Sequence, residues 1–211
     1  IFSLEMSKEQ LVQRMLCSEA EVDTQKLKTG NMQSTDWEKL TTAMNHFADA
    51  PLYIDDRPGA TVMDVRAKCR RLAMEKKEIG LIVIDYLQLM EASGKEDRTQ
   101  QISGISRGLK GLARELNVPV IALSQLSRAV ESRPDKRPMM SDLRESGAIE
   151  QDADIIMFIY RDEYYNKEDT ENRGKAEVIV AKHRNGAVGS IDLLFQGAIT
   201  KFKNIAKTNV F

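Results

Sequence analysis

The stretch Leu81-Ile82-Val83-Ile84-Asp85 decides the fold class, because an unbroken apolar run ends there on one carboxylate. Apolar residues without alternation are typical of a strand buried on both faces, as in a parallel sheet with helices on each side. A charge has no place inside such a strand, so Asp85 is expected at its carboxyl end. Open α/β sheets bind ligands at that end, and in nucleotide motors a carboxylate there belongs to the magnesium shell of a triphosphate. From Asp85 alone, a strand that simply ends on a polar residue is an equally good interpretation.

The sequence on both sides of this run alternates between strand and helix patterns. Ser7, Thr35 and Thr61 each precede a helical stripe, the second of which contains Trp37, Leu40, Met44 and Phe47, and apolar residues at steps of three and four predict a helix over 102–116. Strands are expected at 1–4, 52–54, 118–123 and 155–160, with a strand pair at 177–182 and 190–195 whose connection holds Asn185-Gly186, a dipeptide that favours a tight hairpin turn. Segments 91–100, 127–141 and 161–175 are polar and are expected to be loops. This order predicts an α/β fold with a mostly parallel twisted sheet flanked by helices and a C-terminal antiparallel hairpin.

Composition narrows the class of protein. The chain has 211 residues, 42% hydrophobic and 30% charged, with a formal net charge of −1, so contact with nucleic acid would need a local basic patch. No apolar run approaches the length of a membrane span. Cys17 and Cys69 are far apart and fall in helical patterns, which indicates reduced core thiols of a cytoplasmic protein. The chain opens on a strand pattern, as if cut from something longer.

Polar residues follow several of the expected strands and could share one site. Glu5 follows Leu4, Asp85 follows Ile84, Ser124 and Gln125 follow Leu123, and Lys182, His183 and Arg184 follow a later strand. Phosphoryl transfer uses a set of groups of this kind: a carboxylate that positions water, a carboxylate for a metal shell, an amide and a cationic pair. Each of them taken singly could be a solvated strand end.

One part of a nucleotide motor is missing from the sequence. The phosphate-binding loop GxxxxGK[ST], whose backbone amides cradle phosphates, does not occur. Ser93-Gly94-Lys95 does not qualify, because Glu96 follows the lysine. A strand, this loop and a helix are expected upstream of Ile1.

Residues 128–144 carry a modest positive charge, and Arg144-Glu145-Ser146-Gly147 lies at the end of this segment, ahead of Ala148-Ile149-Glu150. A cation, a small residue and a glycine let a backbone amide approach a phosphate closely. Aromatic stacking partners are absent, so single-stranded nucleic acid would be held through its backbone, without reading of sequence. A solvated loop ahead of a helix is the plainer interpretation of this composition.

Five blocks together resemble the C-terminal motor domain of DnaB-type replicative DNA helicases, bacterial or phage. They are residues 2–6 (FSLEM), 82–89 (IVIDYLQL), 119–128 (PVIALSQLSR), 142–154 (DLRESGAIEQDAD) and 182–186 (KHRNG), and the likeness extends to about residue 204. The resemblance implies a RecA-like P-loop NTPase core over 1–204 with a short tail at 205–211. It also implies an ATP-hydrolysing enzyme that works as a hexameric ring, uses ATP and Mg²⁺, translocates on single-stranded DNA and unwinds duplex DNA at a replication fork. Primase and a helicase loader are implied partners, in the cytoplasm.

The same resemblance assigns roles to individual residues. Glu5 is similar to the carboxylate that activates the attacking water, Asp85 to the Walker B residue that orders magnesium by way of water, and Gln125 to the sensor of the γ-phosphate. Lys182 and Arg184 resemble the pair delivered to a neighbouring subunit's ATP, with Arg184 as the finger. Arg128, Arg144, Glu145 and Gly147 match the residues that hold the DNA backbone.

The chain departs from the family pattern in two respects. The P-loop and its lysine are absent, as are the N-terminal domain and linker helix, so this stretch alone is not expected to hydrolyse ATP. His183 stands where relatives often carry glutamine. Two other functions stay open: a RecA-like recombination or repair ATPase, and a non-catalytic docking module that has lost its P-loop.

Overall fold

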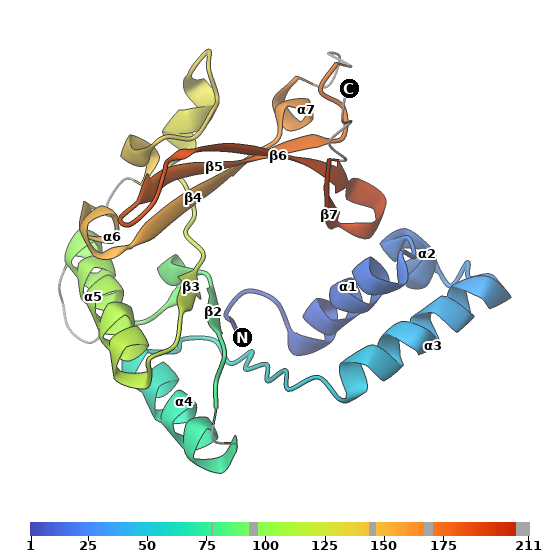
Figure 1. The fold of residues 1–211 in the computed structure, drawn as a ribbon, viewed down its shortest axis with the longest axis horizontal. Coiled ribbons are helices and arrows are strands. Elements are labelled where there is room, and N and C mark those ends of the chain that lie inside the picture. Colours follow the sequence, from blue (N-terminus) through green and yellow to red (C-terminus); the bar gives the residue numbers. More distant parts are fainter. Residues whose placement is uncertain (77, 93–96, 144–146, 167–170, 206–211) are drawn as a thin grey trace. The chain divides into compact units, whose positions relative to one another are not determined.

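The computed structural model describes residues 1–76, 78–92, 97–143, 147–166 and 171–205 of the chain. Contacts between backbone positions divide it into two compact units (Figure 1). The first comprises 1–8 and 53–156, and the second comprises 9–52 and 157–211. The expectation of a single domain over 1–204 stays a prediction.

The first unit is built on a three-stranded parallel sheet in the order β1-β2-β3. The strands are β1 (Phe2–Ser3), β2 (Ile82–Asp85) and β3 (Val120–Ala122). Ile82 and Ile84 of β2 are buried, Val83 is half-buried and Leu81 is exposed, so the decisive apolar run is a central strand with one exposed leading residue. The parallel sheet expected from that run is confirmed.

Helices α4 (Val62–Lys76) and α5 (Arg98–Leu116) bury their apolar stripes in the core of this unit. Thr61 begins α4 as expected, because its hydroxyl accepts the N–H of Asp64 and the Asp64 carboxylate accepts the N–H of Thr61. Gly108 lies inside α5, where a Cβ would stand 2.8 Å from Cγ1 of Val62. The two helices therefore approach closely at this point, which explains a glycine in a helix interior.

The remaining elements of the first unit are short. They are the 3₁₀ turns η1 (Leu87–Leu89), η2 (Arg128–Ser132) and η3 (Met140–Asp142) and the helix α6 (Gly147–Asp152). The second unit contains α1 (Lys8–Ala20, of which Lys8 belongs to the first unit), α2 (Thr24–Thr29), α3 (Ser34–Ala48) and α7 (Asp162–Tyr165). Its four-stranded sheet has the order β4-β5-β6-β7, with antiparallel pairing of β5 to β6 and of β6 to β7. These strands are β4 (Ile155–Tyr160, of which Ile155 and Ile156 belong to the first unit), β5 (Lys175–His183), β6 (Gly189–Gln196) and β7 (Lys201–Asn204), with the turn η4 (Gly197–Ile199) before β7.

The alternation of strands and helices and the C-terminal antiparallel pair are confirmed, and several details differ. Helices α2 and α7 and strand β7 were not expected, and segment 52–54 contributes no strand: the pairing there is one bridge between Phe2 and Asp55. Trp37 and Met44 are each 56% exposed, because α3 buries Leu40 and Ala43 instead. The β5–β6 connection spans residues 184–188, longer than a two-residue turn. Cys17 and Cys69 are buried free thiols. Within the described ranges, no helix has the length and apolarity needed to span a bilayer.

Candidate active site

The parallel pairing of the first unit brings three of the expected site residues to one edge of the sheet. Ser3 is the register partner of Asp85, and the N–H of Leu4 donates to the carbonyl of Asp85 over 2.7 Å. On the other side of β2, the N–H of Leu123 donates to the carbonyl of Ile84 over 2.9 Å. Glu5, Asp85 and Gln125 therefore follow the carboxyl ends of adjacent strands, as the sequence predicted.

Glu5 is an exposed carboxylate on a turn that a buried serine holds in place. Ser3 is 1% exposed, and its hydroxyl donates to the carbonyl of Met6 over 2.7 Å. This bond closes the chain around Glu5 immediately after β1. Glu5 is thus held on a turn directly after the carboxyl end of β1.

Asp85 is the last residue of β2 and is half-buried. Within the described part of the chain, no hydrogen bond or ion pair to its carboxylate is found. Magnesium is commonly held by one or two carboxylates together with waters and substrate phosphates, so a carboxylate at a strand end fits such an ion. The described residues contain no group of three or more His, Cys, Asp or Glu side chains that could bind a metal without a substrate.

Gln125 is held by a residue that the sequence did not single out. The side-chain oxygen of Gln88 accepts the N–H of Gln125 over 3.1 Å, and the Gln88 amide nitrogen donates to Ser124 Oγ over 3.0 Å. Gln88 lies in η1, directly after Asp85 and Tyr86, and Leu87 donates its N–H to the carbonyl of Leu123. The segment after β2 and the segment after β3 are therefore joined by main-chain and side-chain bonds.

Asp55 flanks the same edge on the far side of β1. Its carbonyl accepts the N–H of Ser3 over 2.8 Å, and its carboxylate forms ion pairs with Arg57 and Lys68. Burial by itself raises the pKa of Asp55, but the hydrogen bonds from Arg57 and Lys68 outweigh it and lower the pKa from 3.8 to about 2. Asp55 is therefore ionised and already paired with cations at neutral pH.

Lys182 and Arg184 belong to the second unit, at the end of β5. Lys182 lies in the last part of β5, and Arg184 is the first residue of the turn that follows His183, the last residue of the strand. The His183 ring lies over Gly186, where an added Cβ would stand 1.8 Å from Nδ1. The imidazole is therefore packed against the turn that follows β5. Arg184 is exposed and Lys182 is half-buried.

The segment expected to contact DNA contains an ion pair between the buried Asp142 and the half-buried Arg133. Asp142 is 3% exposed, and both its carboxylate oxygens accept hydrogen bonds from the Arg133 guanidinium, over 2.6 and 2.9 Å. The carbonyl of Asp142 also accepts the N–H of Ser127 over 2.9 Å. The polar segment 127–141 was expected to be a long exposed loop. It contains the 3₁₀ turn η2 and the start of η3, and Arg133 is paired with Asp142.

The predicted DNA-binding residues are placed only in part. Arg128 and Gly147 are exposed, at the first positions of η2 and α6, while Arg144 and Glu145 lie outside the described residues. Helix α6 is anchored to α5 at its end, because Ser106 Oγ donates to an Asp152 carboxylate oxygen over 2.8 Å and Lys110 binds the Asp152 carbonyl.

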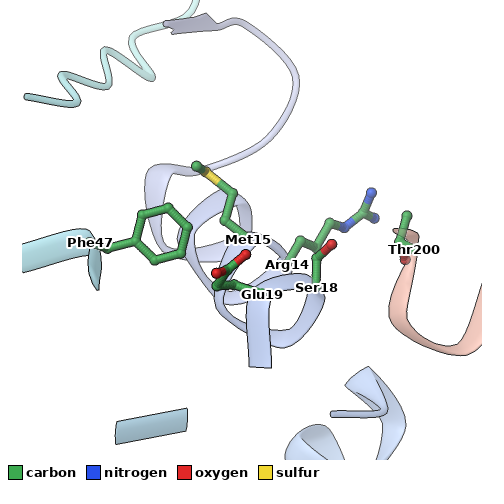
Figure 2. A pocket seen from close by; sticks show the side chains of 6 residues that line it. All are labelled: Arg14, Met15, Ser18, Glu19, Phe47 and Thr200. Carbon is green, nitrogen blue, oxygen red and sulfur yellow. The ribbon is translucent and has the colours of Figure 1, made fainter. Parts of the chain in front are cut away.

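A shallow hollow of about 330 Å³ lies in the second unit, and none of the predicted site residues lines it (Figure 2). Its lining comes from α1, α3 and the residue before β7, and Glu19 and His46 approach within 3.5 Å near it. The lining residues are Arg14, Met15, Ser18, Glu19, Phe47 and Thr200. None of the residues predicted for phosphoryl transfer belongs to this hollow.

Comparison with known proteins gives concordant results for sequence and structure. Residues 1–204 match the family described as DnaB-like helicase C terminal domain. The chain is 60% identical over 209 residues to the replicative DNA helicase DnaB of Geobacillus stearothermophilus and 59% identical to the replicative DNA helicase DnaC of Bacillus subtilis (strain 168). Each alignment covers 98% of this chain and 46% of the relative, so the chain spans about half the length of these relatives.

Two solved structures superpose on it with a TM-score of 0.91. One, described as an ATPase domain, is 47% identical, over 97% of this chain and 73% of that one. The other, a DnaB-like replicative helicase described with its interactions with primase, is 48% identical over 97% of this chain and 49% of that one. The RecA-like fold expected from the sequence resemblance is confirmed.

Proposed function

We propose, because this chain belongs to the DnaB-like helicase C-terminal domain family, that it is the motor of a replicative DNA helicase. In the full-length protein it would hydrolyse ATP, translocate on single-stranded DNA as a hexameric ring and unwind the duplex at a replication fork. The observation that supports this most strongly is the convergence of Glu5, Asp85 and Gln125 at the carboxyl ends of three adjacent parallel strands.

Each of these residues would have a separate task. Asp85, whose carboxylate has no partner in the described part of the chain, would hold Mg²⁺ through water beside the phosphates of ATP, and the ion supplies charge neutralisation when bound. Glu5 would accept a proton from the attacking water. The bond from Ser3 to Met6, which closes the turn around Glu5, would keep its backbone in place. Gln125 would contact the transferred phosphoryl and report its presence to the segment that follows it.

Lys182 and Arg184 would act on the ATP of a neighbouring subunit. Their position two residues apart, at the end of β5 and the start of its connection to β6, supports delivery as a pair. A guanidinium that reaches the transferred phosphoryl stabilises negative charge as it develops, and such a finger contributes about 10³ to 10⁵ in rate. The homohexamer is thus part of the catalytic proposal, because the site would be complete only between subunits.

Single-stranded DNA would be held by Arg128 and by the segment that leads into α6, with Arg144, Glu145 and Gly147. The buried Arg133–Asp142 pair supports this role, because it fixes the chain between η2 and η3 while leaving Arg128 exposed. Phosphate contacts of this kind give affinity without sequence preference and weaken with salt. Primase and a helicase loader would be the protein partners, in the cytoplasm.

The finger gives the sharpest test of this function. In a full-length protein carrying this sequence, Arg184→Ala should abolish DNA-stimulated ATP hydrolysis and leave ATP binding within about two-fold, because the arginine acts in the transition state. Arg173→Ala, another arginine of the second unit, is the matched control and should hydrolyse ATP normally. Normal turnover in Arg184→Ala would remove the finger. A strand-exchange activity in place of unwinding would instead favour a recombination ATPase.

A further inference from the structure

The side chain of Gln88 binds the main chain of Gln125 at both of its polar groups. Oε1 of Gln88 accepts the N–H of Gln125 over 3.1 Å, and Nε2 of Gln88 donates to the Gln125 carbonyl over 3.3 Å. The same nitrogen donates to Ser124 Oγ over 3.0 Å. One primary amide thus pairs with Gln125 as a neighbouring strand would, at a point where β3 has already ended.

Only a side chain with a donor and an acceptor on one planar group can make this pair of contacts. A carboxylate at position 88 would keep the acceptor and lose the donor, and a thioether of the same length would lose both. Asparagine has the right group on a stem one carbon shorter. The chemistry of the contact therefore selects glutamine.

Gln88 is itself fixed on its main-chain side. Its carbonyl oxygen accepts a hydrogen bond from Nη2 of Arg98 over 2.5 Å, and Nη1 of Arg98 donates to Gln101 Oε1 over 2.9 Å. The first turn of α5 therefore holds η1, and η1 holds the segment after β3. Because η1 begins two residues after Asp85, the amide also ties Gln125 to the end of β2.

We propose that Gln88 is a positioning residue that sets where Gln125 stands relative to Asp85, and so couples the sensor to the metal-binding strand. This inference rests on the proposed nucleotide contact of Gln125. Gln88 itself is not proposed to contact the nucleotide. Its effect on hydrolysis passes through Gln125 alone.

The test is a double-mutant cycle in a full-length protein carrying this sequence, with DNA-stimulated ATP hydrolysis as the readout. Gln88→Met, close in size but without polar groups, should lower kcat about ten-fold and change the KM for ATP less than about two-fold, since neutral hydrogen bonds are lost away from the substrate. Gln125→Ala should lower kcat further, and the double variant should equal Gln125→Ala. Gln88→Glu should fall between wild type and Gln88→Met. Gln100→Met, an exposed glutamine in the first turn of α5, is the matched control.

Hydrogen exchange of the Gln125 backbone amide tests the contact with Gln88 separately from its effect on ATP hydrolysis. It should accelerate in Gln88→Met and stay unchanged in Gln100→Met, whether or not Gln125 acts on ATP. Unchanged exchange, or kcat losses that multiply in the double variant, would overturn the positioning role and leave the proposed function intact. Wild-type turnover in Gln125→Ala would instead remove the sensor assignment, and this inference with it.

Discussion

Leu4 donates its backbone N–H to the carbonyl oxygen of Asp85 over 2.7 Å, so the residue after β1 is joined to the last residue of β2. Glu5 is the next residue after this bond, and Asp85 is the residue that accepts it. The separation of the two acids is therefore set by main-chain pairing, which is less easily altered than a contact between side chains.

Asp55 should make stability depend on pH in the acid range. Its pKa is lowered from 3.8 to about 2 in the folded chain, so its contribution is complete above its unfolded pKa and is lost as the pH falls through the folded value. We expect Asp55→Asn to reduce the free energy of unfolding by about 2 kcal/mol at pH 7, with a difference from wild type that shrinks towards zero near pH 2. Urea unfolding at several pH values measures it, and a difference that is independent of pH would contradict the pairing.

The Arg133–Asp142 pair should stabilise the segment between η2 and η3. Asp142→Asn leaves a half-buried guanidinium without its charged partner, and we expect a loss of about 2 kcal/mol in the free energy of unfolding. Adding Arg133→Met to this variant should cost little more, because the interaction is already broken. Chemical denaturation of the two single variants and the double variant tests this, and fully additive losses would mean that the pair contributes nothing as a pair.

Arg128 should contribute one phosphate contact to DNA binding. Arg128→Ala is expected to weaken binding of single-stranded oligonucleotides and to reduce the slope of log K against log salt concentration by about 0.7, the share of one phosphate. Arg71→Ala removes the same charge from a side chain that is 79% exposed on α4, and it should leave the slope unchanged. Fluorescence anisotropy across a salt series gives both slopes, and equal slopes in the two variants would exclude a phosphate contact at Arg128.

The parts of the fold and the site that were predictable depend on local pattern. The apolar run before Asp85 predicted a parallel strand with Asp85 at its carboxyl end, and Glu5 and Gln125 were placed at the same edge because they follow other expected strands. The helix over 102–116 was predicted correctly from its period, and the structure adds a first turn capped by Asp97.

The parts that were missed depend on contacts between distant residues. Gln88 and Gln125 are 37 positions apart, and nothing in the pattern around Gln88 distinguishes its amide from that of a solvated glutamine. Arg133 and Asp142 were counted as loop charges, because composition does not reveal which charges pair. Of the apolar helical stripe, Leu40 is buried as predicted, but Trp37 and Met44 are exposed, and α3 buries Ala43, which was not part of the stripe.

The central claim, that Glu5 and Asp85 act on one nucleotide, is tested most directly by single-turnover ATP hydrolysis in a full-length protein carrying Glu5→Gln, Asp85→Asn or both. Each single change should lower the rate by about 10² to 10⁴, the usual contribution of a general base or of a group that acts with it. The double variant should be no slower than the slower single variant, because the effects of residues that act together in one step are not additive. Rates that fall by the product of the two single effects, or a wild-type rate in either variant, would contradict a shared site.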